Sequence, residues 1–309
     1  MSQVIKKLPI PIVALMLALA ATGNLVLSYG KLYRNIFGVL AAIILTLMII
    51  KIFKYPNEVN KSLKNPVIAS VFPAFSMGIM LVSTYIKPFA PFLAFGTWIV
   101  GLILHCILII SFTKNYVFNF NIKNVFPSWF IVYVGIVVGS VTAPAFDKIN
   151  IGQALFWFGF ISYLILLPII LFRVLKIKNI PEPAQPTIAI FAAPASLCLA
   201  GYISSFQDKN MFLVLLLVAL SQFTLLCVLL QLPKLLKLPF YPSYSAFTFP
   251  LVISAISIKL TNGFLINAGK EINMLKYIVK FEEFIAIIIV LYVLLRYINF
   301  LFSKTETAN

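Results

Sequence analysis

The sequence predicts an all-α integral membrane protein with ten transmembrane helices. Three observations carry this prediction: 62% of the 309 residues are hydrophobic, only 10% are charged, and long apolar runs recur from end to end. A helix needs about 20 apolar residues to cross roughly 30 Å of hydrocarbon, and so few charges cannot cover a soluble protein of this length. The expected spans are 9–28, 36–53, 66–86, 91–113, 126–145, 151–172, 186–205, 210–231, 242–261 and 278–302.

The odd-numbered spans share a proline signature. Each opens at a proline, and successive steps from Pro11 are 55, 61, 59 and 56 residues. These opening prolines are Pro9 or Pro11, Pro66, Pro127, Pro186 and Pro242. A second proline, or a glycine, follows about two turns later in four of the five spans. A proline inside a helix removes a backbone hydrogen bond, and such a break persists at membrane depth only where it packs in protein or lines a cavity. The expected kink or pore-lining positions are Pro73, Gly135, Pro194 and Pro250.

The even-numbered spans are smoother and richer in bulky aliphatic residues, as in "GVLAAIILTLMII". The repeating unit is therefore a helical hairpin of one kinked inner and one lipid-facing outer helix. A fixed period indicates a symmetric arrangement, so the five kinked helices are expected to surround a central pore, with five outer helices around them. The chain 1–309 is then a single transmembrane domain with hairpins at 9–53, 66–113, 126–172, 186–231 and 242–302.

Charge sets the expected orientation and location. Lys and Arg are concentrated at the N-terminus, in the even-numbered loops and at the C-terminal end, which places both termini in the cytoplasm by the positive-inside rule. The ninth loop is an exception to this pattern, because it contains several lysines although it is odd-numbered. The net charge of +16 is spread over the connections, which excludes a nucleic-acid groove. The first span is expected to remain in place as the first helix of a multi-pass protein of the inner or plasma membrane, because no cleavage site is evident.

Acidic residues are scarce, and we expect all eight to lie in connections, at helix ends or in the tail. Cation-coupled carriers usually bury a carboxylate within their spans, so this pattern favours a neutral or anionic permeant. No paired aspartates of the kind that hold magnesium within membrane enzymes and no HExxH motif are found. We therefore expect no enzymatic activity, no metal and no cofactor.

The histidine and the cysteines are interpreted as packing residues. His105 lies on an outer span, with no acidic residue or second histidine close by in the sequence to form a proton relay. Cys106, Cys198 and Cys227 occupy separate apolar spans without metal-like spacing, which is typical of small core residues.

The ninth span, "SAFTFPLVISAISIK", carries the most informative side chains. Phe249 precedes the second proline and is either a core aromatic or a hydrophobic plug that closes a pore by excluding water. Lys259 is either a snorkelling end residue or a charge that concentrates anions at the pore mouth. Three hydroxyl residues, Thr248, Ser254 and Ser257, either contact a permeating anion or bond the backbone or a neighbouring helix.

This stretch closely resembles the ninth helix of the tellurite-resistance/dicarboxylate transporter (TDT) family, which includes the plant guard-cell slow anion channels. Three further stretches, "NPVIASVFPAF", "FPSWFIVYVGIVVGS" and "QPTIAIFAAPASLCLAGYIS", resemble its third, fifth and seventh helices, so the resemblance covers nearly the whole chain. The resemblance implies ten helices, five inner and five outer, a homotrimer with one pore per protomer, and a pore closed by Phe249. One departure lies in the first helix, where Ala14 and Ala18 stand in place of family glycines and Thr22, Gly23 and Asn24 follow as small and polar candidates for the lining.

The sequence thus predicts a passive, gated anion channel whose partners are small inorganic or carboxylate anions and the lipid bilayer. The first alternative is a secondary carrier for C4-dicarboxylates such as malate, or for oxyanions such as tellurite or sulfite. The second is a membrane sensor or scaffold that transports nothing, which the repeated kinked helices disfavour.

Overall fold

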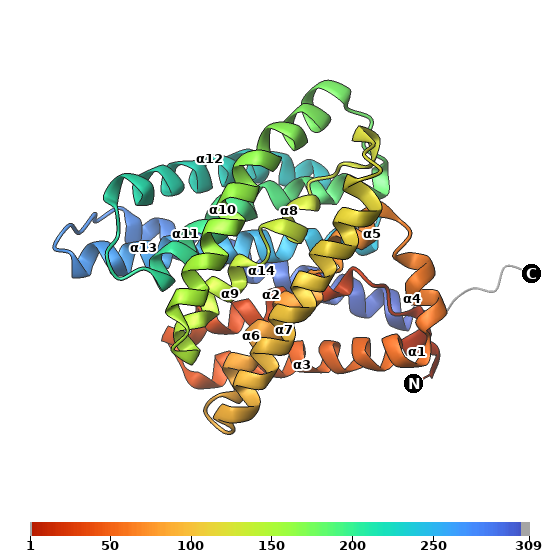
Figure 1. The fold of residues 1–309 in the computed structure, drawn as a ribbon, viewed down its shortest axis with the longest axis horizontal. Helices are drawn as coiled ribbons and strands as arrows, with labels where there is room; N and C mark the ends of the chain where they lie inside the picture. Colours follow the sequence, from red (N-terminus) through yellow and green to blue (C-terminus); the bar gives the residue numbers. More distant parts are fainter. Residues whose placement is uncertain (1, 304–309) are drawn as a thin grey trace, which may run out of the picture.

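The computed structural model describes residues 2–303, and this part of the chain is helical without any strand (Figure 1). Within it, nine helical segments are long and apolar enough to cross a membrane. These are Ile12–Tyr29, Lys31–Lys54, Pro66–Ile86, Pro91–Val117, Ile149–Ile177, Glu182–Ser205, Met211–Leu235, Pro242–Asn267 and Leu275–Phe302. The expectation of a multi-pass helical membrane protein is confirmed. The last residues of the chain, including the acidic Glu306, lie outside the described part.

The fifth predicted span, 126–145, does not form one continuous helix. It consists of two short helices, α8 (Trp129–Tyr133) and α9 (Val137–Thr142), followed by a 3-10 turn, η4 (Ala143–Phe146). The interruption contains Gly135, and β-branched residues surround it, so local helix propensity is low. The amide of Gly135 donates to the Phe130 carbonyl across 3.3 Å, which keeps the broken backbone satisfied.

The long helices fall into two groups by burial. In the segments that begin at Ile12, Pro66, Glu182 and Pro242, between 61% and 83% of the most apolar window is buried, against 22–28% in the other five. The buried group comprises α2 (Ile12–Leu25), α5 (Pro66–Val71) with α6 (Ala74–Ile86), η6 (Glu182–Ala192) with α11 (Ala193–Ser205), and η7 (Pro242–Phe247) with α13 (Thr248–Asn267). The exposed group comprises α3 (Lys31–Lys54), α7 (Pro91–Phe112), α10 (Ile149–Phe172), α12 (Met211–Leu235) and α14 (Leu275–Phe302). Burial therefore alternates along the chain.

The buried helices break where the second prolines lie. The break between α5 and α6 falls at Phe72 and Pro73, and η6 and η7 are 3-10 helices that change to α-helix just before Pro194 and Pro250. Backbone amides and a hydroxyl group next to these breaks donate to the carbonyls there. The amide of Met77 donates to the Pro73 carbonyl at 3.1 Å, and Thr248 Oγ1 donates to the Ser245 carbonyl at 2.6 Å. These carbonyls are therefore paired within the protein.

Two short helices lie at the ends of the bundle near the N-terminus, α1 (Ser2–Lys7) and α4 (Pro56–Ser62). Lys7 Nζ donates to the Ser303 carbonyl at 3.0 Å, so α1 lies beside the end of α14. The beginning and the end of the described chain are therefore on the same side of the bundle.

His105 is fully buried between α6 and the broken fifth segment. Its Nδ1 lies 2.8 Å from Ser76 Oγ and its Nε2 lies 3.1 Å from the Val132 carbonyl. Both ring nitrogens are satisfied, which is what a packing role requires. The cysteines differ from one another: Cys198 is buried and Cys106 is half-buried, but Cys227 is exposed on α12. The expectation of a core position is wrong for Cys227, because hydropathy does not distinguish a core face from a lipid-facing one.

Candidate functional site

Three cavities line up along the buried helices. The proline-side cavity, about 410 Å3, lies at the helix starts and is lined by Pro9, Ile10, Pro11, Ser62, Asn65, Pro66, Val67, Ile68, Phe126, Pro181, Pro183, Ala184, Tyr241, Pro242 and Ser243. The phenylalanine cavity, about 30 Å3, is lined by Ala14, Leu17, Ala74, Met77, Phe130, Ile131, Val134, Gly135, Ile190, Ala193, Pro194, Leu197, Ser245, Ala246, Phe249 and Pro250. The lysine-side cavity, about 500 Å3, is lined by Ala21, Asn24, Leu25, Leu27, Ser28, Leu81, Val138, Val141, Leu197, Ser204, Phe249, Ile253, Ile256, Lys259 and Leu260.

The order of the three cavities is the same along all five proline-containing segments. In the ninth predicted span, for example, Pro242 lines the first cavity, Phe249 the second and Lys259 the third. In the first span the corresponding residues are Pro11 and Leu17, followed by the residues around Asn24. The five segments therefore run in the same direction around one common axis. The space along this axis is wide at the first cavity, narrow at the second and wide again at the third.

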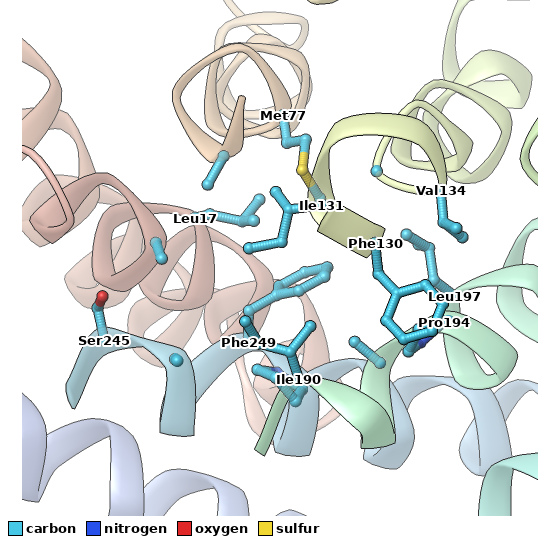
Figure 2. A pocket seen from close by; sticks show the side chains of 16 residues that line it. Leu17, Met77, Phe130, Ile131, Val134, Ile190, Pro194, Leu197, Ser245 and Phe249 are labelled. Atoms are coloured by element: carbon cyan, nitrogen blue, oxygen red, sulfur yellow. The ribbon is translucent and has the colours of Figure 1, made fainter. Parts of the chain in front are cut away.

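The narrow cavity is closed by large apolar side chains. Figure 2 shows Phe249, Phe130 and Ile131 pointing into it from α13 and α8, with Leu17 on the opposite wall. Ser245 is the one hydroxyl side chain among the residues that line it, and its Oγ donates to the Pro242 carbonyl at 3.2 Å. A volume of about 30 Å3 has room for one or two water molecules, but one hydroxyl is fewer than the two to four polar partners that a buried water needs. Phe249 is 6% exposed and borders both this cavity and the lysine-side cavity.

The lysine-side cavity has a polar rim. Asn24, Ser28 and Ser204 line it together with Lys259. Arg34 lies next to this rim, because its Nε donates to Asn24 Oδ1 at 3.0 Å. Two cationic side chains thus belong to this end of the axis.

The ammonium group of Lys259 has several bonding partners at the lysine-side cavity. Its Nζ lies 2.5 Å from Glu283 Oε1, 2.9 Å from the Leu25 carbonyl and 2.8 Å from Ser28 Oγ. Tyr29 Oη donates to the second oxygen of Glu283 at 2.6 Å. The sequence predicts Lys259 either as a snorkelling end residue or as an anion-concentrating charge, and it contains no sign that a carboxylate on the neighbouring helix pairs with it.

The acidic residues also depart from expectation. Glu282 and Glu283 were expected at a connection or helix end, but they lie about two turns inside α14, and each is 4% exposed. Helix α14 begins at Leu275 and packs against α13, and Leu225 and Leu229 of α12 lie around the same small cavity as Glu282. Sequence distance from the loop gave no sign of that burial, because it arises from neighbouring helices.

Three of the predicted kink or lining residues border the narrow cavity: Gly135, Pro194 and Pro250. Gly135 leaves no space for a side chain, since a Cβ there would lie 2.2 Å from the Ile131 carbonyl and 2.7 Å from Met77 Sδ. Gly135 therefore allows the fifth segment and α6 to approach each other closely at the break.

Of the other predicted lining residues, Asn24 borders the lysine-side cavity, whereas six border none of the three cavities: Thr22, Gly23, Pro73, Thr248, Ser254 and Ser257. Gly23 packs against the hydroxyl of Tyr85 on α6, and Pro73 caps α6. Thr248 and Ser257 are buried and donate to backbone carbonyls of their own helix. Ser254 is buried on α13 outside all three lining sets. Thr248 and Ser257 thus bond the backbone, whereas Ser254 Oγ completes a hydrogen bond neither with the backbone nor with a neighbouring helix.

Several functional candidates were missed by sequence reasoning. The collar around Phe249, formed by Leu17, Phe130, Ile131 and Ile190, consists of residue types that are common throughout the chain. The one available signal was position, since each lies within about two turns of an opening proline. Glu283 gave no signal, because its partner Lys259 is 24 residues away in the sequence.

The axis enclosed by the five segments has one narrow point. No group of three His, Cys, Asp or Glu side chains that could hold a metal ion occurs among residues 2–303. What the axis offers is two wide, partly polar cavities separated by an apolar constriction.

Two comparisons with known proteins bear on this arrangement. A family model described as SLAC1, voltage-dependent anion channel, matches residues 8–298. The chain is also 26% identical over 259 residues to an uncharacterized transporter of Methanocaldococcus jannaschii, covering 76% of this chain and 75% of that protein. The resemblance seen in the sequence is confirmed: this chain belongs to the SLAC1 family of voltage-dependent anion channels.

Proposed function

We propose that the protein is a passive, gated anion channel of the cell membrane. The observation that carries this proposal is the apolar constriction of about 30 Å3 at Phe249 between cavities of about 410 and 500 Å3. A narrow apolar segment between two hydrated spaces stops ions by dewetting. Phe249 is the gate in this proposal, because it borders both the constriction and the lysine-side cavity.

The five segments that share the cavity order are the inner helices of the proposed pore. The broken fifth segment is counted as one of them, which gives ten spans in five hairpins. The proximity of α1 to the end of α14 supports both termini on one side, and the distribution of Lys and Arg favours the cytoplasmic side. Assembly as a homotrimer with a separate pore per protomer completes the proposal.

Anion preference arises in this proposal from positive potential rather than from a tight binding site. Lys259 and Arg34 lie at the lysine-side cavity, and the carboxylates of Glu282 and Glu283 do not border any of the three cavities. Conduction requires binding weak enough for the ion to leave. Pairing with Glu283 reduces the positive potential that Lys259 contributes to the cavity, and this keeps anion binding weak.

Purified protein in planar lipid bilayers tests the proposal. We expect unitary currents that reverse near the anion equilibrium potential under a salt gradient. Saturable exchange of malate, tellurite or sulfite without unitary currents would replace the channel with a carrier. If chloride, nitrate, malate, tellurite and sulfite all fail to cross the membrane, the protein is neither a channel nor a carrier for these anions.

A further inference from the structure

A second group of polar side chains lies away from the proposed anion path, between α12, α13 and α14. Glu282 of α14 is 4% exposed, and Ser254 of α13 is fully buried. Ser254 and Gln222 of α12 face the Glu282 carboxylate. None of their facing atoms, Glu282 Oε1 and Oε2, Ser254 Oγ and Gln222 Nε2, completes a hydrogen bond in this structure. Buried polar groups are rarely left in this state without a ligand or a proton to complete them.

The surroundings of Glu282 contain no cation. The small cavity beside it, about 10 Å3, is lined by Leu225, Leu229, Leu251, Phe281 and Ile285 in addition to Glu282 itself. Of the basic side chains on the three helices, Lys259 is bonded to Glu283 and Arg296 lies over the Tyr244 ring. The remaining three, Lys234, Lys276 and Lys280, are exposed. The acidic neighbour, Glu283, already holds Lys259 and Tyr29.

An ionised carboxylate in such a place would be both unsolvated and unpaired, which costs several kcal/mol. A metal ion does not fit, because sodium or calcium needs about six oxygen ligands, and this site offers a carboxylate, a hydroxyl and an amide among aliphatic side chains. A cavity of about 10 Å3 holds at most one water molecule. The ligand that matches this chemistry is a proton.

We propose that Glu282, Ser254 and Gln222 form a proton-binding site that couples pH to the gate helix. A proton from water binds one carboxylate oxygen of Glu282, the resulting neutral carboxyl donates to Ser254 Oγ, and Gln222 Nε2 donates to the other carboxyl oxygen. Loss of the proton returns it to water and leaves a buried charge that must draw in water or move α13. Ser254 lies five residues, somewhat more than one turn, beyond Phe249 on that helix, so such a movement reaches the constriction.

Infrared difference spectroscopy of the full-length protein in liposomes tests the site without requiring any flux. We expect a carbonyl stretch from a protonated carboxyl at neutral pH that shifts in heavy water and disappears as pH rises. It should be absent in Glu282→Gln and retained in Glu283→Gln, the matched neighbour on the same helix. In Ser254→Ala the band should shift in frequency, because a hydrogen-bonding partner is lost. A band that persists in Glu282→Gln, or no protonated carboxyl in the wild type, overturns the site.

The coupling to the gate rests on the proposed channel function and has its own measurement. We expect the anion current to change at least about threefold between pH 6 and 9 in the wild type and in Glu283→Gln, and to lose this dependence in Glu282→Gln. A wild-type current independent of pH, or one whose dependence survives in Glu282→Gln, overturns the coupling while the infrared result still decides the site. A wild type without any current would contradict the proposed function instead.

Discussion

Lys259 Nζ on α13 lies 2.5 Å from Glu283 Oε1 on α14. Lys259 lines the lysine-side cavity, and Glu283 lies behind it, outside the lining. The Glu283 side chain is 5% exposed, whereas that of Lys259 is 32% exposed. The lysine also donates to the Leu25 carbonyl and to Ser28 Oγ, so this pair joins α14, α13 and the end of the first buried segment. Cavity charge and helix packing therefore depend on the same two residues.

Replacing Glu283 with glutamine should increase anion current. The substitution removes the negative partner and leaves the positive charge of Lys259 facing the cavity, which concentrates anions there. We expect an increase of roughly two- to tenfold at low ionic strength that shrinks as salt screens the charge. Unitary conductance in bilayers at low and high salt measures it. Equal conductance of wild type and variant at low salt would remove this pair from the selectivity mechanism.

Removal of Lys259 should destabilise the protein more than removal of its partner. Lys259→Met leaves the buried Glu283 carboxylate without a counter-charge, at a cost of about 3 kcal/mol. Glu283→Gln leaves no buried charge, and its cost should be about 1 kcal/mol. Denaturant unfolding in identical detergent micelles compares the two. The opposite ranking would show that the carboxylate is satisfied without the lysine.

Reversing the charge at the same position tests selectivity instead of stability. Lys259→Glu should lower anion-over-cation permeability, which the reversal potential under a salt gradient measures.

Phe249→Ala should open the constriction. The substitution removes a ring from a cavity already as small as about 30 Å3, and we expect the mean current per inserted channel to rise roughly tenfold, or about 1.4 kcal/mol in the closed-to-open equilibrium. Phe247→Ala is the matched control. Phe247 is fully buried two residues earlier, stacks edge-on with Tyr244 at 4.9 Å and lines none of the three cavities. A similar rise in both variants would mean that loosened packing, not loss of a gate, admits ions.

Gly135→Ala should destabilise the broken fifth segment. The added methyl group would meet the Ile131 carbonyl and Met77 at distances that no side chain tolerates, so we expect a loss of about 1–3 kcal/mol. Gly96→Ala on α7 is the control, since a Cβ there meets nothing within 4 Å. That variant should unfold at the same denaturant concentration as the wild type or a higher one. If Gly135→Ala behaves like Gly96→Ala, the close approach at the break is not required.

His105→Leu should reduce stability without changing the response to pH. The variant loses the bonds to Ser76 and to the Val132 carbonyl, and leaving that carbonyl buried without a partner costs about 1–3 kcal/mol. The pH profile of the anion current should match the wild type, in contrast to Glu282→Gln. A profile flattened by His105→Leu would assign proton binding to the histidine.

Much of the fold could be predicted from local information. Apolar length predicts all ten proposed spans, and nine of them are long apolar helical segments within residues 2–303. Paired prolines mark three of the four buried long segments, those with Pro66, Pro186 and Pro242, because such a break is stable where it packs in protein. An opening proline alone does not predict burial, since Pro91 opens the exposed α7. The fifth span resisted this reasoning. Its composition is as apolar as the others, but Gly135 and the surrounding β-branched residues leave it as two short helices.

The sequence by itself determined that this protein resides in the membrane, where its helices break, and that Phe249 stands beside one of those breaks. Only the tertiary structure decided which side chains share a space: the collar around Phe249, the pairing of Lys259 with Glu283, and the isolation of Glu282 beside Ser254. The reason is that hydropathy and backbone propensity act over a few neighbouring residues. Charge compensation depends on distances between helices that are far apart in the chain.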